Sequence, residues 1–144
     1  MRQKVVVFSQ IDSIILQKLK DRYEVACIDP KVGDVNQQIL KEVTDADGMI
    51  GAGRLLNESN LQSAKQLKVI STVSVGYDNY DLNYLNQQKI WLANTPHVLT
   101  ETTADLAFTL LMSAARQVTH LDAWTKQGLW KKTVGSAQFG LDIY

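Results

Sequence analysis

Short β-rich runs alternate with helical patterns over residues 1–99, and this alternation constrains the fold more than any other feature. Residues 5–8 form a continuous run of three valines and a phenylalanine, which is typical of a strand buried on both faces. Further strands are predicted at residues 25–28, 48–51, 68–73 and 90–93. Strands that alternate with helices predict a parallel sheet covered on both faces, which is a flavodoxin-like, doubly wound α/β fold.

The helices between these strands are predicted from apolar spacing and from capping residues. Apolar residues recur at helical spacing over 11–19 and over 35–43, so each range is predicted to form an amphipathic helix. Asn57 can cap a short helix that extends to Ala64, and Asp81 can cap another helix. We therefore expect helices on both sides of the sheet.

The pattern changes after Pro96. Residues 101–127 contain neither proline nor glycine, so they predict one continuous helix, for which Thr100 is a good cap. At ~1.5 Å per residue this helix would be about 40 Å long, which exceeds what a small domain needs. We expect the helix to bridge to another body. Gly128 would end it, and residues 130–144 predict an irregular arm.

Composition excludes several classes of partner. Lys+Arg and Asp+Glu each total 15, so no net charge draws the chain to nucleic acid or to a membrane surface. No apolar run is long enough for a signal-peptide core or a membrane span. Cys27 is the single cysteine, which rules out an internal disulfide and suits a reducing cytoplasm. It lies in a predicted buried strand, where we expect an inert, small hydrophobic side chain.

Ligands of parallel sheets bind beyond the carboxyl ends of the strands, which makes the loops at that edge the candidate site. The most informative segment is 71–81, where a strand end leads into a turn. Gly76 allows the backbone to approach a ligand closely, and consecutive free N–H groups there would suit a carboxylate or another anion. The alternative is that Val75 and Gly76 form only a junction between the strand and the turn.

These motifs resemble the D-isomer-specific 2-hydroxyacid dehydrogenase family. The resemblance lies in Val-Gly-Tyr-Asp-Asn-Tyr-Asp at 75–81, in Asn-Thr-Pro at 94–96, and in Thr-Thr-Ala-Asp at 102–105, which opens the long helix. Residues 98–102 are most similar to the glyoxylate/hydroxypyruvate reductase and 2-ketogluconate reductase branch. The resemblance covers essentially the whole chain. It implies a substrate-side catalytic domain at residues 1–99, with an interdomain helix and dimerisation arm at residues 100–144.

The resemblance also implies roles for particular residues. The implied substrate-binding residues are Val75, Gly76, Gly53, Arg54 and Leu55. Backbone N–H groups at the first two would hold the carboxylate of a small 2-oxo acid such as glyoxylate, hydroxypyruvate or 2-ketogluconate. Arg54 is unusual in its loop, and a solvated surface arginine is the alternative interpretation. Thr103 matches a position that approaches the NAD or NADP cofactor, and the alternative is an ordinary residue in the first turn of the helix.

No catalytic residue of the family can be assigned in this chain. The arginine, the carboxylate and the histidine that do the chemistry, and the glycine-rich turn for the cofactor, belong to a second domain in the family. No G-x-G-x-x-G occurs in the 144 residues. His97 and His120 are interpreted as structural or solvated. We expect the chain alone to be inactive and to bind NAD or NADP poorly.

The sequence also bears on metal binding and on association. Asp78, Asn79 and Asp81 lack the further ligands of a calcium loop, so caps and turns explain them better and no metal is expected. The apolar stripe of the long helix would be exposed, which favours a homodimer or higher oligomer. Trp124 and Trp130 suit that interface. A stand-alone α/β binding or regulatory module that associates through its long helix is the alternative.

Overall fold

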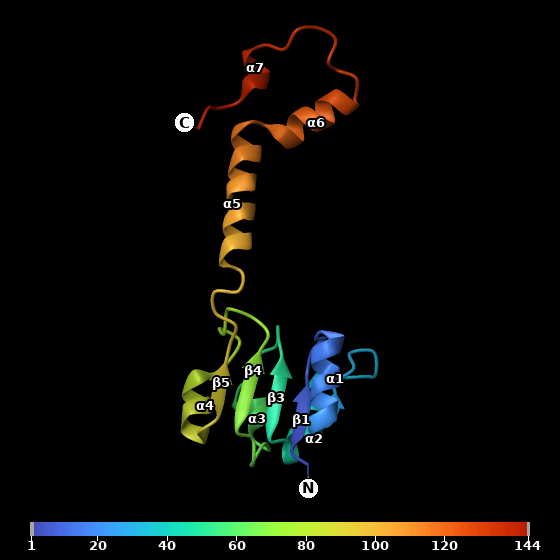
Figure 1. The fold of residues 1–144 in the computed structure, drawn as a ribbon, viewed down its shortest axis with the longest axis vertical. Helices are drawn as coiled ribbons and strands as arrows, with labels where there is room; N and C mark the ends of the chain where they lie inside the picture. The colour runs from blue at the N-terminus through green and yellow to red at the C-terminus, as the bar shows by residue number, and fades with distance from the viewer. Residues whose placement is uncertain (1, 144) are drawn as a thin grey trace. The chain divides into compact units, whose positions relative to one another are not determined.

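The computed structural model describes residues 2–143. It divides into two compact units, one ending at His97 and one beginning at Val98. The first unit contains the sheet and its helices, and the second consists of helices and connecting segments (Figure 1).

The first unit is built on a sheet of five parallel strands. The strands are β1 (Lys4–Val7), β2 (Glu24–Cys27), β3 (Gly48–Gly51), β4 (Val69–Thr72) and β5 (Trp91–Ala93). Their order is β2-β1-β3-β4-β5, and every neighbouring pair is parallel. This order is that of a flavodoxin-like fold, so the predicted fold class is confirmed.

Short helices connect these strands. They are α1 (Ser13–Arg22), α2 (Val35–Glu42), the 3-10 helix η1 (Val43–Asp45), α3 (Glu58–Leu61) and α4 (Leu82–Gln88). The predicted caps are confirmed, because the Asn57 side chain accepts a hydrogen bond from Ser59 N and the Asp81 side chain accepts one from Tyr84 N. The expected extension of α3 to Ala64 is wrong. The N–H of Ala64 donates to the carbonyl of Leu61, three residues back, which is a turn.

The hydrophobic core lies on one face of the sheet. Val6, Met49 and Ile70 occupy matching positions on β1, β3 and β4, and all three are buried. Buried side chains from α2, α3 and α4 pack in the same cluster. Because side chains alternate between the two faces along each strand, every second side chain points into this core.

The expected helices are present on both sides of the sheet, but the face opposite the core is only partly covered. Within residues 2–97, only α1 borders this face, and none of its residues is buried. Val69 is 40% exposed and Trp91 is 79% exposed. An apolar hollow of about 250 Å³ lies beside α1, lined partly by Leu19 and Val5. The expectation of a buried Cys27 is wrong: its side chain is exposed, because β2 is an edge strand.

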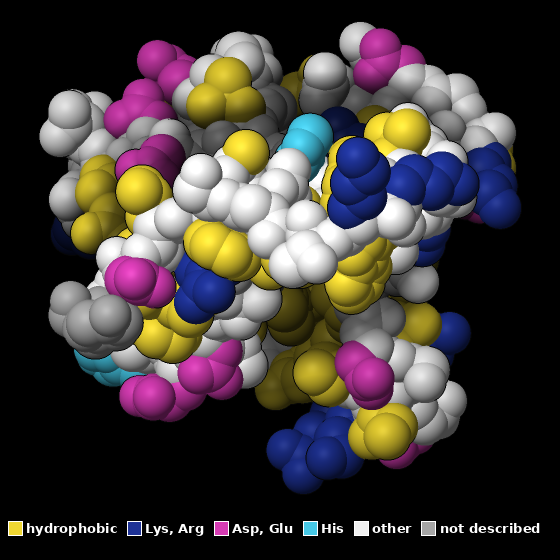
Figure 2. Space-filling model, turned by 90° about the horizontal axis from the view of Figure 1, so that it is seen from above, with side chains coloured by type: hydrophobic (Ala, Val, Ile, Leu, Met, Phe, Trp, Pro, Cys, Tyr) yellow, Lys and Arg dark blue, Asp and Glu magenta, His cyan; other side chains and the backbone are white. Residues whose placement is uncertain are grey.

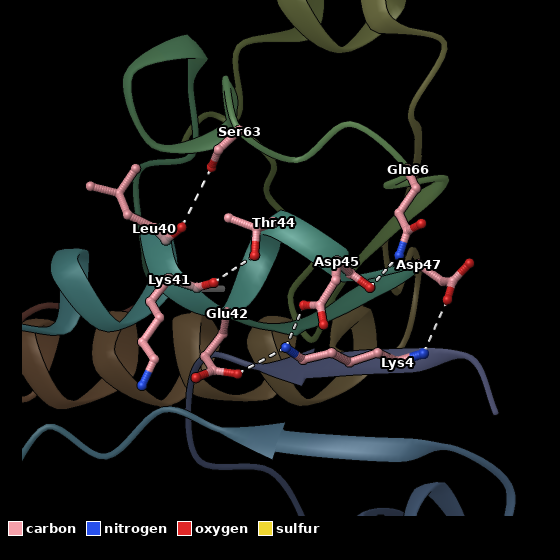
Figure 3. Close-up of polar contacts among 9 residues, drawn as sticks. All are labelled: Lys4, Leu40, Lys41, Glu42, Thr44, Asp45, Asp47, Ser63 and Gln66. Atoms are coloured by element: carbon pink, nitrogen blue, oxygen red, sulfur yellow. Dashed lines mark hydrogen bonds and ion pairs between the residues drawn. The ribbon is translucent and has the colours of Figure 1, made fainter. Parts of the chain in front are cut away.

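Ion pairs hold the beginning of β1 against the end of α2. Lys4 Nζ lies 2.9 Å from Glu42 Oε2 and 2.6 Å from Asp45 Oδ1 (Figure 3). Burial lowers the pKa of Lys4, but the hydrogen bonds and charges of Asp45 and Glu42 outweigh it and raise that pKa. Hydrogen bonding to Lys4 lowers the pKa of Asp45. Lys68 pairs with Asp47 at 2.8 Å at the same edge of the sheet.

The prediction of one continuous helix over residues 101–127 is wrong, because the second unit contains two helices in this range. Its helices are α5 (Thr100–Ala115), α6 (Val118–Lys126) and α7 (Ser136–Phe139). Gln117 has φ 53°, which is left-handed backbone and ends the α5 hydrogen-bond series. The N-cap of α5 is Leu99, without a side-chain cap, so Thr100 is not the cap. The short α7 interrupts the arm that was expected to be irregular.

Contacts distant in sequence explain this break. The N–H of Leu141 donates to the carbonyl of Ala115 at 2.7 Å, and Arg116 Nε donates to the carbonyl of Phe139 at 3.1 Å. Gly140 has φ 68°, and a Cβ there would collide with the Ala115 carbonyl oxygen. The end of the arm is therefore fixed to the last turn of α5. Gln117 Nε2 donates to the carbonyl of Ala137, which holds the break itself.

Among residues 98–143 none is buried. Figure 2 shows hydrophobic side chains between charged ones on the face it draws. On α5 the exposed hydrophobic side chains include Leu106, Phe108, Leu110 and Leu111, each more than half exposed. The predicted exposure of the apolar stripe is confirmed. Within the second unit, the rings of Trp124 and Trp130 stack with centroids 6.4 Å apart. No helix within residues 2–143 is long and apolar enough to cross a membrane.

Candidate functional site

Two loops at the carboxyl edge of the sheet form the framework of the candidate site. They are residues 52–55 after β3 and residues 74–78 after β4. At one end, the N–H of Val73 donates to the carbonyl of Gly51 at 2.9 Å. At the other end, the N–H of Leu56 donates to the carbonyl of Asn79 at 2.8 Å. Backbone hydrogen bonds thus hold the two loops side by side at both ends.

Val75 and Gly76 present unused backbone donors between these two points. The carbonyl of Val75 accepts from Asn94 Nδ2 at 2.9 Å, and the carbonyl of Gly76 accepts from Ser74 Oγ at 2.6 Å. The N–H groups of Val75 and Gly76 have no acceptor among the described residues, and both residues are exposed. The carbonyls of Ser74 and Val75 share peptide planes with these two N–H groups and both accept hydrogen bonds, so the N–H groups are held in place. They remain available to an anion.

Neighbouring loops fix this turn further. The N–H of Thr95 donates to the carbonyl of Ser74 at 3.0 Å, and the N–H of Ala52 donates to Ser9 Oγ at 2.8 Å. The ends of β1, β3, β4 and β5 therefore meet in one hydrogen-bonded edge. A hollow of about 690 Å³ lies beside it between α4 and β5, with Tyr77 and Asn94 among its lining residues.

The loop after β3 carries the other three predicted substrate-binding residues. Gly53 has φ 71°, with open space where a Cβ would stand. Leu55 is exposed, and its carbonyl accepts from Asn60 Nδ2 at 2.9 Å. Arg54 is partly buried, and it makes no ion pair or side-chain hydrogen bond with a described residue. The structure thus brings this loop beside Val75 and Gly76.

Tyr80 is a feature of this region that the sequence did not reveal. It is 6% exposed, and its hydroxyl has no hydrogen-bond partner among the described residues. Asp81, in contrast, has the capping role that was expected, since it accepts from Tyr84 N at 3.0 Å. Within residues 2–143, no group of three or more His, Cys, Asp or Glu side chains is placed to hold a metal ion.

The remaining predicted residues are in other segments of the chain. Thr103 is exposed in the first turn of α5, where its N–H donates to the carbonyl of Leu99. His97 is exposed with φ 65°, and His120 is exposed on α6. Thr103 and His120 belong to the second unit, whereas Val75 and Gly76 belong to the first.

Comparison with known proteins gives consistent matches. Residues 5–137 match the model of the D-isomer specific 2-hydroxyacid dehydrogenase, catalytic domain. Glyoxylate/hydroxypyruvate reductase B of Yersinia pestis (strain Pestoides F) is 37% identical over 144 residues, which are all of this chain and 44% of the relative. The chain therefore spans less than half the length of this curated relative.

Solved structures agree with this match. The TT0316 protein of Thermus thermophilus has a TM-score of 0.79 and 35% identity, over 97% of this chain and 45% of that one. The NADPH-dependent glyoxylate/hydroxypyruvate reductase of Sinorhizobium meliloti, in complex with NADP and malonate, has a TM-score of 0.71 and 27% identity. That alignment covers 90% of this chain and 40% of the reductase.

Proposed function

Because the chain belongs to the D-isomer-specific 2-hydroxyacid dehydrogenase family, we propose that it is the substrate-side portion of an NAD(P)-dependent enzyme that reduces small 2-oxo acids to D-2-hydroxy acids. Glyoxylate, hydroxypyruvate and 2-ketogluconate are the candidate substrates, and the name of the Yersinia relative supports the first two. The observation that carries this proposal is the pair of unused N–H groups at Val75 and Gly76.

In this proposal the two N–H groups donate to the carboxylate of the 2-oxo acid. Backbone donors that are already oriented bind an anion without further reorganisation, which makes a fixed turn a good carboxylate site. The loop with Gly53, Arg54 and Leu55 borders the other side of the substrate. This part of the enzyme binds and orients the substrate, and no residue of this chain is assigned a proton-transfer role.

The cofactor of the complete enzyme is proposed to be NAD or NADP, which would supply the hydride. The Sinorhizobium reductase was solved with NADP. Thr103 is the residue proposed to approach the cofactor. The residues present do not form a dinucleotide cradle, since no glycine-rich turn of the G-x-G-x-x-G type occurs in the sequence. We propose that the 144-residue chain alone binds neither nucleotide well and has no turnover.

Nuclear magnetic resonance tests the carboxylate site directly. Titration of the chain with glyoxylate should shift the amide signals of Val75 and Gly76. Gly76→Ala should weaken this response, because the added methyl group would lie at the N–H pair. A Cβ at Gly76 would meet only Asp78 Oδ2, at 3.4 Å, so the fold should be kept. Gly48→Ala, on β3 beneath the loops, is the control and should respond as the unchanged chain does.

Calorimetric titration with NADH and NADPH tests the second part of the proposal. We expect no binding heat, no change in nicotinamide fluorescence and no reduction of glyoxylate by the chain alone. Binding at micromolar concentrations would contradict this and favour the alternative, a stand-alone α/β regulatory module that associates through α5.

Association is proposed to occur through the second unit, as a homodimer or a higher oligomer. None of residues 98–143 is buried, and α5 exposes Leu106, Phe108 and Leu110. Apolar surface of this kind drives association. Light scattering at low concentration should give a mass above that of one chain, and a monodisperse monomer would contradict the proposal. The proposed location is the cytoplasm, which a single unpaired cysteine suits.

A further inference from the structure

We infer that Arg54 forms a second anion-binding point in the site, and that the site therefore prefers 2-oxo acids that carry a second carboxylate. This inference rests on the proposed function, because it takes the N–H groups of Val75 and Gly76 as the binding point for the first carboxylate. It goes further in naming a class of 2-oxo acid that the site would bind more tightly than the monocarboxylates glyoxylate, hydroxypyruvate and 2-ketogluconate, and the residue that selects it.

The surroundings of Arg54 differ from those of every other cation in the first unit. Of the lysines and arginines at residues 2–97, only Lys4 and Arg54 are not exposed. Lys4 is balanced by Glu42 and Asp45. Arg54 has no carboxylate or other side-chain partner among the described residues. A partly desolvated charge is unfavourable until it is paired, so this guanidinium is suited to receive an anion.

Arg54 lies in the loop that runs beside the loop of the proposed carboxylate site. Gly51 pairs with Thr72 across β3 and β4, and neighbouring strands lie about 4.8 Å apart. Arg54 is three residues beyond the first of these and Val75 is three residues beyond the second. Both lie in the loops that are held together at each end by backbone hydrogen bonds. Gly53 leaves open space beside Arg54.

The charges of the two loops support the same assignment. Asp78 is their single carboxylate, and it is exposed and makes no ion pair with Arg54. A guanidinium binds a carboxylate through two parallel hydrogen bonds, which also fixes the direction of the ligand. A 2-oxo dicarboxylate can thus engage Val75 and Gly76 with one end and Arg54 with the other. Glyoxylate has one carboxylate and can engage only one of these points.

The experiment compares 2-oxoglutarate with 2-oxopentanoate, which has the same chain length and lacks the second carboxylate. Each is titrated into the 144-residue chain while the amides of Val75 and Gly76 and the Nε–H of Arg54 are followed by nuclear magnetic resonance. We expect 2-oxoglutarate to bind about tenfold more tightly, as one charge-assisted contact allows. Arg54→Gln should remove this difference, and Arg22→Gln, an exposed arginine on α1, should preserve it.

The outcomes separate this inference from the proposed function. Equal binding of the two acids, with shifts at Val75 and Gly76, would overturn the role of Arg54 and leave the carboxylate site in place. A tenfold preference that persists in Arg54→Gln would also overturn it. The absence of any shift at Val75 and Gly76 with either acid would overturn the proposed function itself. The inference is supported if Arg54→Gln abolishes the preference for 2-oxoglutarate and Arg54→Lys, which keeps a positive charge, retains part of it.

Discussion

Gly51, the last residue of β3, is predicted to tolerate no side chain. A Cβ at Gly51 would lie 2.7 Å from Phe8 Cδ2, 2.8 Å from Cε2 and 2.9 Å from Cγ. Phe8 is 2% exposed, so its ring is enclosed and cannot move into solvent. Adding a methyl group to a packed interior typically costs about 1–3 kcal/mol. We therefore expect Gly51→Ala to lower the free energy of unfolding by about 2 kcal/mol.

Gly48→Ala on the same strand is the matched control. A Cβ at Gly48 would find its nearest atom, Val69 Cγ1, at 3.5 Å, which is ordinary contact. Neither glycine has positive φ, so backbone strain does not separate the two substitutions. We expect Gly48→Ala to change the free energy of unfolding by no more than about 0.5 kcal/mol.

Urea unfolding followed by far-ultraviolet circular dichroism provides the measurement. With a urea dependence of about 2 kcal/mol/M, Gly51→Ala should lower the midpoint by about 1 M. Phe8→Leu removes ring atoms that would collide, so Gly51→Ala should cost less when combined with it than when made alone. Equal midpoints for Gly51→Ala and Gly48→Ala would show that the ring of Phe8 does not pack against Gly51.

Three further predictions concern other parts of the chain. Tyr80→Phe should raise the free energy of unfolding by about 1 kcal/mol, measured by urea unfolding, because it removes a buried hydroxyl that has no partner among the described residues; a destabilised variant would show that the hydroxyl is bonded. Because Lys4 lowers the pKa of Asp45, the pair stabilises the fold above the ordinary carboxylate pKa of about 4, and this contribution should be lost as pH falls through the lowered value. Lys4→Met should make unfolding less dependent on pH in that range, and an unchanged dependence would contradict the role of the pair. Gly140→Ala should speed hydrogen exchange at the Leu141 amide without changing the unfolding midpoint of the first unit, because the Cβ would displace the Ala115 carbonyl; unchanged exchange would contradict this.

Local sequence signals predicted the features that depend on local interactions. The strand at 48–51 coincides with β3, and the other strand predictions lie within a few residues of the observed ones. Asn57 and Asp81 cap helices because an Asn or Asp side chain reaches the N–H groups two or three residues later, whatever the rest of the fold does. The prediction that the loops after β3 and β4 lie at the same edge of the sheet followed from the parallel direction of the strands.

The errors concern features decided by distant contacts. Residues 101–127 carry no helix breaker, and α5 ends at Ala115 because the chain near Gly140 returns to bond that turn. Cys27 is exposed because β2 lies at the edge of the sheet, which depends on strand order. The lack of a partner for Arg54 among the described residues is also invisible in the sequence, since it depends on which carboxylates the fold places nearby.

The contact between Ala115 and the residues around Gly140 means that the chain leaves α5 and comes back to the same point. The segment between them forms a loop whose two ends are hydrogen-bonded to each other, so its length does not determine where Leu141 lies relative to Ala115. Doubling the length of a flexible loop costs only about 0.6 kcal/mol in closure entropy. Insertions or deletions at residues 131–134, which follow the Trp124–Trp130 stack and have no helix or strand, should therefore be tolerated, and arms of different length can be exchanged without altering α5.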